Sequence, residues 1–132
     1  MCICVFANLF ICFLLRKYSF ERLEVWQLSR KLVQQIYLVT QDFSDSEKFG
    51  IVIQIRRASI SVSNNIVEGS SRRSTKDKKR FIEIAYGSLL EVLNLLILSN
   101  DLDLISTNKL TEYRDLIEEL SNKLNALRNS IR

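Results

Sequence analysis

The most constraining feature of this sequence is a run of apolar residues near its C-terminal end that alternate three and four positions apart. Seven consecutive positions fit the pattern: Leu110, Tyr113, Ile117, Leu120, Leu124, Leu127 and Ile131. This spacing places every one of these side chains on one face of an α-helix. The pattern therefore predicts a long amphipathic helix that starts near Ser106 or Thr107 and buries one side.

Three more segments have the same periodicity, and they predict helices over about 23–40, 48–68 and 74–100. Leu32, Val62 and Leu89 lie in the apolar stripes that these three helices are expected to bury. Ser74 with Asp77 fits an N-cap followed by an acid three positions later, so the third helix should start there. Gly69 should end the second helix as a left-handed cap.

The second of these segments has a wider apolar surface than the others. Ile53, Ile60 and Val67 recur seven positions apart, beside the main stripe. A surface of this width indicates a helix covered on more than one side.

Short connections between these helices predict the overall architecture. Sequential helices joined by five to seven residues must lie antiparallel, so we expect an all-α, up-down-up-down antiparallel four-helix bundle over residues 18–132. The chain has no proline and three glycines, which argues against a β-sandwich with many tight turns.

The N-terminal residues, 1–17, differ from the rest of the chain. Thirteen of residues 2–15 are apolar, yet the run is shorter than the roughly 20 residues of a membrane-spanning helix. A dispensable extension, a short helix packed on the domain or a neighbouring subunit, and a membrane-associated stretch all remain open. Cys2, Cys4 and Cys12 all lie in this segment, so no disulfide framework is expected in the domain.

The positive charge is concentrated in the middle of the chain. The net charge is +4, but residues 48–80 contain nine Lys or Arg against two acids. Six of these cations follow one another closely and are expected to be exposed: Arg72, Arg73, Lys76, Lys78, Lys79 and Arg80. Because they flank the start of a helix, where cations are disfavoured, they indicate a phosphate-bearing partner. A solvated basic loop and a helix-turn-helix reader are the alternatives, and Arg56 and Arg57 are a less certain extension of the site.

Polar residues inside the predicted helices have structural or interface roles in this interpretation. They are Asn65, Glu68, Ser88 and Glu91, and Arg56 or Arg57 could face a glutamate on an adjacent helix. The chain has no histidine, so the commonest general base and metal ligand is missing. We expect no enzymatic activity, no catalytic residue, no metal, no cofactor and no small-molecule substrate.

Several motifs occur together in one order. They are Phe20-Glu21-x-Leu23-x-Val25-Trp26-Gln27, Gln54-Ile55-Arg56-Arg57-Ala58-x-x-Ser61, Asn65-Ile66-Val67-Glu68-Gly69, Arg73-Ser74-Thr75-Lys76-Asp77, Arg80-Phe81 and Ala85-Tyr86-Gly87-Ser88-Leu89-x-Glu91. This set resembles the four-helix-bundle proteins encoded in intervening sequences of bacterial 23S rRNA genes. Those proteins are similar in turn to the accessory variability protein of diversity-generating retroelements.

The resemblance implies a cytoplasmic bacterial protein that assembles as a homopentamer and binds RNA or DNA through a positive surface. In the retroelement relatives it also implies contact with a reverse transcriptase. Two features depart from the family pattern: Ser63 stands where proline is usual, and the apolar segment before Tyr18 has no counterpart.

Two functions from different classes follow. The first is a nonenzymatic, oligomeric, nucleic-acid-binding bundle. The second is a protein–protein assembly scaffold, for example an accessory subunit of a reverse transcriptase. A membrane-tethered bundle that uses residues 2–15 is a third and weaker possibility.

Overall fold

A computed structural model describes residues 17–132 of the chain. The secondary structure of this part consists of helices joined by short connections, without a β-strand. Its elements in chain order are two 3-10 helices and four α-helices: η1 (Ser19–Arg22), α2 (Glu24–Thr40), η2 (Asp45–Glu47), α3 (Ile51–Ser71), α4 (Thr75–Asp101) and α5 (Thr107–Ser130). The predicted all-α fold with four helices is confirmed. The expected N-terminal extension lies outside the described residues, except for Lys17.

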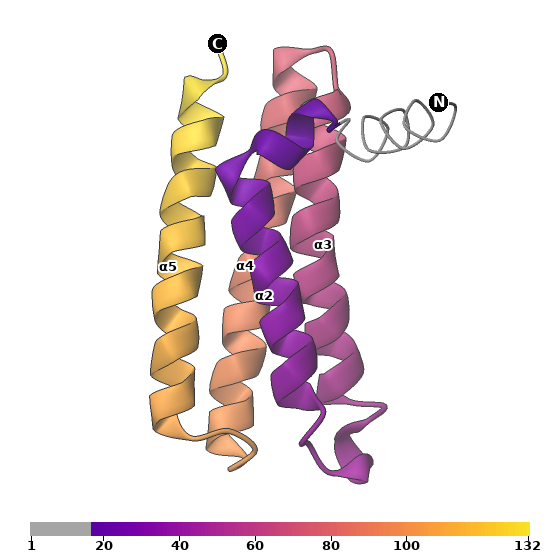
Figure 1. Ribbon diagram of the computed structural model, residues 1–132, viewed down its shortest axis with the longest axis vertical. Coiled ribbons are helices and arrows are strands. Elements are labelled where there is room, and N and C mark those ends of the chain that lie inside the picture. The colour runs from indigo at the N-terminus through magenta and orange to yellow at the C-terminus, as the bar shows by residue number, and fades with distance from the viewer. Residues whose placement is uncertain (1–16) are drawn as a thin grey trace, which may run out of the picture.

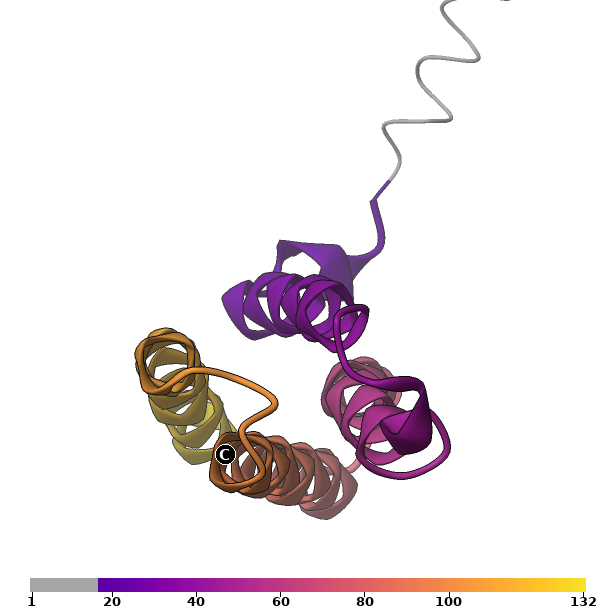
Figure 2. The ribbon, with the colours of Figure 1, turned by 90° about the horizontal axis from the view of Figure 1, so that it is seen from below.

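The four α-helices lie side by side along the long axis of the molecule (Figure 1). The α3–α4 connection lies at one end, together with η1 and the C-terminus, and the other two connections lie at the opposite end. Seen along this axis, the helices surround a common centre (Figure 2). The contact between α3 and α4 is the most extensive, and α2 also touches α5, which closes the ring.

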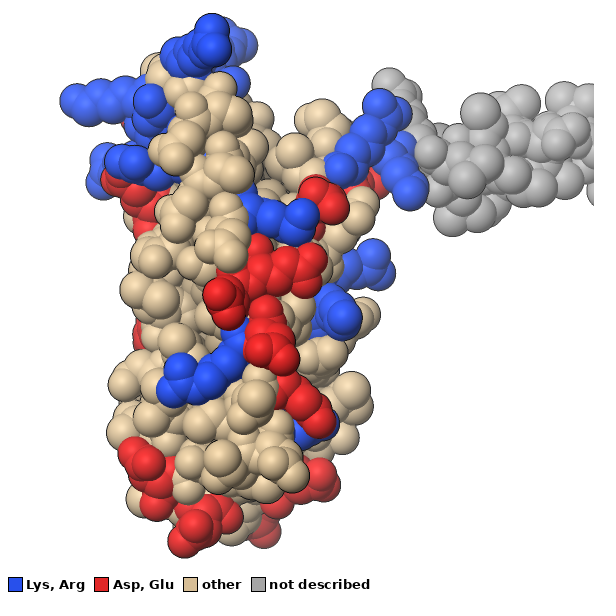
Figure 3. All heavy atoms as spheres, turned by 90° about the vertical axis from the view of Figure 1, so that its left-hand side faces the viewer, with Lys and Arg blue, Asp and Glu red and all other residues tan. Residues whose placement is uncertain are grey.

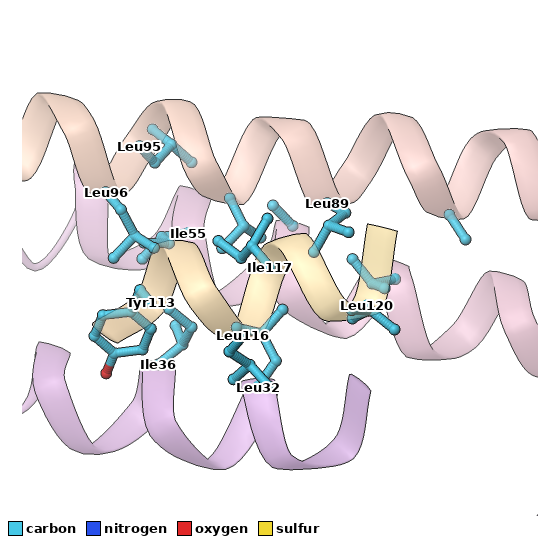
Figure 4. Packing of buried hydrophobic residues seen from close by; sticks show 14 of the residues in the cluster. Leu32, Ile36, Ile55, Leu89, Leu95, Leu96, Tyr113, Leu116, Ile117 and Leu120 are labelled. Carbon is cyan, nitrogen blue, oxygen red and sulfur yellow. The ribbon is translucent and has the colours of Figure 1, made fainter. Parts of the chain in front are cut away.

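The core is built from the apolar stripes that the sequence predicts. Leu32, Ile55, Leu89 and Leu120, one from each helix, are fully buried. Figure 4 shows these side chains meeting between the helices, with Tyr113 of α5 closing the core near Ile36 of α2. The second stripe of α3 lies outside the core, because Ile53 and Ile60 are exposed.

Two helix starts are capped by a serine, and the sequence predicts the first of these caps. The Ser74 hydroxyl accepts a hydrogen bond from the Asp77 backbone N–H at 3.1 Å, and Ser106 does the same for Lys109 at 3.1 Å. Each bond satisfies one of the N–H groups that a helix start leaves without a partner. The start of α4 at Ser74 is therefore confirmed, and Ser106 is the cap of α5.

The predicted start of the second helix and the role of Gly69 need correction. Helix α3 begins at Ile51 rather than near residue 48, because Asp45–Glu47 form a separate 3-10 turn. Gly69 does not end α3, which continues to Ser71, and its φ angle is not positive. Gly69 is buried, and a Cβ atom there would lie 3.1 Å from the Cβ of Phe81. Its lack of a side chain therefore lets α3 and α4 approach closely.

Within the described residues, α4 is the one helix whose length and apolar composition would allow it to cross a membrane. Its inner face, which includes Ala85, Leu89 and Leu96, is buried in the bundle. A core helix of a water-soluble bundle has the same composition.

We expect alanine to have opposite effects at two glycines. Gly87 has no atom within 4 Å of its would-be Cβ, so Gly87→Ala should raise the free energy of unfolding by about 1 kcal/mol through helix propensity. Gly69→Ala should lower it by about 1 kcal/mol, because crowding against Phe81 outweighs the same gain. Urea unfolding followed by circular dichroism measures both changes. A gain for Gly69→Ala equal to that for Gly87→Ala would contradict the close-packing role.

The buried Tyr113 gives the fold a dependence on alkaline pH. Its hydroxyl donates a hydrogen bond to the Gln35 carbonyl at 2.9 Å. Burial, with a smaller contribution from the charge of Glu112, raises the pKa of Tyr113 from 10.0 to about 12. The folded protein therefore holds the neutral phenol where the unfolded chain has begun to ionise, so this stabilisation is complete below pH 10 and lost as the pH rises through 12.

Removing this hydroxyl tests that dependence. Tyr113→Phe should lower the free energy of unfolding by about 1 kcal/mol at neutral pH, because a buried hydrogen bond is lost. The difference from wild type should shrink above pH 10, because phenylalanine does not ionise. Denaturant titrations at equal protein concentration over this pH range measure it, and a constant difference would refute the assignment.

Candidate nucleic-acid interface

The predicted basic cluster occupies the end of the bundle where α3 leads into α4. Arg72 and Arg73 lie in the connection, and the other four cations lie in the first turns of α4 (76–80). Figure 3 shows Lys and Arg side chains gathered at this end of the molecule. Asp77 is the one acidic residue in the first turn of α4, so the local charge is strongly positive.

The six cations differ in how freely they project. Arg73, Lys76 and Arg80 are exposed, and within the described residues they form no ion pair. Arg72 is exposed but pairs with Glu68 at 2.8 Å, and its guanidinium lies 4.6 Å from the ring centre of Phe81. An exposed pair of this kind contributes little to stability, so Arg72 can exchange its partner for a phosphate.

Lys78 and Lys79 correct the expectation that the whole cluster is exposed. Both are half-buried. Lysine stems commonly lie along apolar surface while the ammonium reaches water, and Lys78 lines an apolar pocket in this way. Their substitution would therefore disturb packing as well as charge.

Charge is separated along the bundle. The connections at the opposite end carry acids, among them Asp42, Asp45, Asp101 and Asp103. Figure 3 shows red side chains at that end and along the α5 face, and blue side chains at the other end. An anionic polymer would thus be attracted to the α3–α4 end and repelled from the opposite end.

A pocket of about 250 Å³ lies within the basic end, between η1, α3, α4 and α5. Leu23, Ile66, Ile82 and Ile131 form apolar walls, and Lys78 is the charged residue among those that line it. The pocket is open to the surface at the basic end, and we call this opening the notch.

Phe20 connects this pocket to a group of aromatic side chains outside it, which we call the aromatic border. Phe20 lines the pocket, and the ring of Tyr18 stacks on Phe20 with a centroid distance of 6.2 Å and an interplanar angle of 16°. Trp26 meets Phe20 edge-on at 5.2 Å, and Arg30 lies over Trp26 at 5.6 Å. Apolar, aromatic and cationic groups thus meet at one end of the bundle.

The segment that contains the basic end matches a known protein family. The model of the family described as 23S rRNA-intervening sequence protein matches residues 21–126. The chain belongs to this family. The match runs from η1 into the last turns of α5 and therefore includes the basic end.

A solved structure shares the fold of this family member. It is the crystal structure of a protein of unknown function from the S23 ribosomal protein family of Bacteroides thetaiotaomicron VPI-5482. The TM-score is 0.74 at 20% sequence identity, and the alignment covers 80% of this chain and 96% of the other. No curated protein matches the chain.

Arg56 and Arg57 are not brought together with the cluster in this family member. Arg56 precedes Arg72 by four to five turns of helix, which corresponds to about 24 Å along α3. Its Nε donates to the Thr40 hydroxyl at 2.8 Å, and its guanidinium lies 4.4 Å from the ring centre of Tyr37. Arg56 therefore joins α3 to α2. The pairing of Arg56 with a glutamate that the sequence suggested does not occur within the described residues. Arg57 is exposed.

The four predicted polar residues divide into two groups. Asn65 and Ser88 are half-buried and lie in one network between α3 and α4, whereas Glu68 and Glu91 are exposed. The Asn65 amide donates to the Ser61 carbonyl at 2.8 Å, and the hydroxyls of Ser61 and Ser88 lie 2.8 Å apart. Asn65 and Ser88 therefore have structural roles, while Glu68 serves as the partner of Arg72.

Sequence reasoning missed some residues that matter here. Ser61, Thr40 and Tyr37 organise the polar contacts of α3, and Tyr18 joins the aromatic border of the pocket. Ser61 stands four positions before Asn65, which is a local signal for a shared face. The contacts of Thr40 and Tyr37 with Arg56 depend on helix packing and have no such signal. Across residues 17–132, no group of three His, Cys, Asp or Glu could hold a metal ion.

Proposed function

We propose that this protein is a nonenzymatic, oligomeric nucleic-acid-binding bundle of the bacterial cytoplasm, and that RNA or DNA binds at its basic end. The observation that carries the proposal is a group of exposed cations around the N-terminus of α4, Arg73, Lys76 and Arg80, which form no ion pair with any residue of 17–132. Arg73 and Lys76 flank the first turn of α4, where a cation opposes the positive end of the helix dipole by about 0.3–1 kcal/mol. A phosphate backbone offsets this cost, and folding alone does not.

The helix start adds donors to the charge. Helix α4 presents backbone N–H groups at its first turn, and Ser74 engages the one of Asp77. Free N–H groups at a helix N-terminus bind anionic oxygens, while Arg and Lys side chains supply charge-assisted hydrogen bonds. In this proposal Arg72, Lys78 and Lys79 complete the phosphate-binding surface, and Arg57 is an outlying contact.

The proposed absence of catalysis rests on chemistry. The chain has no histidine, and the one side chain of residues 17–132 with a strongly shifted pKa, Tyr113, is packed in the core. Neither feature supplies an acid or a base at the basic end. The proposed ligand is a phosphate polymer, and the protein acts by holding it.

Self-association is the second part of the proposal. Ile53 and Ile60 of α3 and Ile84, Leu90 and Leu98 of α4 are exposed apolar side chains on the outer surface of the bundle. Exposed apolar patches mark interaction sites, and we propose that these side chains form one. We propose that up-down-up-down antiparallel bundles associate head to tail through these helices and close into a homopentamer, which would present several basic ends to one ligand.

Charge removal at the basic end tests nucleic-acid binding. The triple variant Arg73→Gln, Lys76→Gln, Arg80→Gln should make the negative slope of log K against log salt shallower by about 2–3 units, because three phosphate contacts are lost. Its thermal stability should stay constant or rise, since the cations oppose the helix dipole. Fluorescence anisotropy with a labelled oligonucleotide at several salt concentrations measures the slope.

A matched variant controls for net charge. Lys31, Lys48 and Arg114 are exposed cations outside the basic end, so their joint change to Gln removes the same charge elsewhere. Binding should then change much less than in the first variant. If both triple variants lose the same amount of affinity, the effect is one of net charge alone, and a localised binding site is refuted. Binding of a protein partner without any salt dependence would favour the assembly scaffold instead.

Oligomerisation is tested by placing charge on the outer face of α3. The wild-type mass in light scattering should be about five times the 15.4 kDa of one chain. Ile53→Glu with Ile60→Glu should reduce it to the mass of one chain, because two carboxylates would be buried in the interface.

The control for that experiment uses apolar residues that are exposed elsewhere. Leu38 and Leu102 are 64% and 57% exposed. Leu38→Glu with Leu102→Glu makes the same chemical change outside the outer faces of α3 and α4, so the oligomer should persist. A wild-type mass of one chain at micromolar concentration would exclude the assembly.

A further inference from the structure

We propose that the notch at the basic end selects single-stranded nucleic acid by taking an unpaired base into its pocket and stacking further bases on Tyr18. This inference rests on the proposed function and names its ligand more closely. The observation behind it is the coincidence of an apolar pocket, an aromatic border and two groups of cations at one end of the bundle.

The pocket has the character of a base site. Its volume is about 250 Å³, and its walls include Phe20, Leu23, Ile66 and Ile131. Flat apolar faces of nucleobases are stabilised by contact with such walls and by aromatic rings. Lys78 is the charged residue that lines the pocket, so its ammonium can pair with the phosphate of the nucleotide whose base is bound.

Cations on both sides of the notch fit the backbone of a single strand. The α3–α4 side carries Arg73, Lys76 and Arg80, and the η1 side carries Lys17 and Arg22, all of them exposed. Figure 3 shows Lys and Arg side chains on both sides of a hollow at this end of the molecule. A strand that crosses the notch would place phosphates on each side while a base points inward.

The aromatic border supplies a stacking surface outside the pocket. Tyr18 is 73% exposed although its ring stacks on Phe20. Exposing an aromatic ring to water is unfavourable unless a partner covers it, and unpaired bases are partners that tolerate any sequence. Arg30 over Trp26 extends the same border with a cation.

A duplex does not fit this arrangement. Its bases are paired and stacked inside the helix, so entry into the pocket would require the pair to open at a cost of a few kcal/mol. A duplex can still bind through its phosphates. The pocket and Tyr18 therefore add affinity for single strands alone.

The test compares one labelled strand of about 15 nucleotides with its duplex, a length near that covered by known single-strand sites. Wild type should bind the single strand more tightly. Tyr18→Ala with Phe20→Leu should weaken single-strand binding by about tenfold or more and leave duplex binding unchanged, because rings are lost and charge is kept. Trp26 is the only tryptophan and touches Phe20, so its fluorescence should respond to the single strand and not to the duplex.

A control variant and a milder variant keep this test decisive. Phe49 is 83% exposed in the connection at the opposite end, so Phe49→Leu should leave both affinities unchanged. Tyr18→Ala alone removes a mostly exposed ring and cannot disturb the core. If circular dichroism shows that the double variant is destabilised, Tyr18→Ala alone replaces it in the test. This single variant should still bind the single strand more weakly than wild type, with a smaller loss than that expected of the double variant.

The outcomes separate this inference from the function on which it rests. Equal affinities for the strand and its duplex, both unchanged in the aromatic variants, would overturn the single-strand inference while nucleic-acid binding stands. No binding of either probe at low salt would overturn the proposed function itself. A single-strand loss in Phe49→Leu as large as in Tyr18→Ala would also refute the pocket as the site.

Discussion

The close packing of α3 against α4 is the contact on which the rest of this structure depends. Gly69 allows the approach, because a Cβ atom there would lie 3.1 Å from the Cβ of Phe81. The hydroxyls of Ser61 and Ser88, 2.8 Å apart, join the helices further along. Helices this close can be linked by three residues, and that short link holds Arg72 and Arg73 beside the start of α4.

This arrangement concentrates charge where the helix itself disfavours it. The first turn of α4 has a partial positive charge, and the cations around it add to that potential. Acids gather at the opposite end of the bundle. Folding does not require such a separation, since the buried apolar side chains already hold the four helices together. The charge pattern is therefore the part of the sequence that a binding function explains best.

Local patterns were sufficient to predict most of the secondary structure. The alternation of three and four along α5 and the Ser74 cap of α4 involve neighbours in sequence, so they can be recognised without the fold. The start of α3 and the role of Gly69 were predicted wrongly. The 3-10 turn at Asp45–Glu47 is a local turn without apolar periodicity, so the pattern does not reveal it. The contact of Gly69 with Phe81 depends on how α3 and α4 pack, which periodicity does not encode.

The sequence by itself determined the four helices, their buried faces and the run of cations, because each of these is a property of residues within a few turns of one another. The tertiary structure alone decided which cations are free. In the folded protein Arg56 contacts Thr40 of α2. Lys78 is half-buried in the wall of the pocket, and Phe20, on which Tyr18 stacks, lines the same pocket. The contact of Arg56 requires α3 to pack on α2, and the pocket requires η1, α3, α4 and α5 to meet at one end. The physical reason for both is the packing of the core that joins the helices.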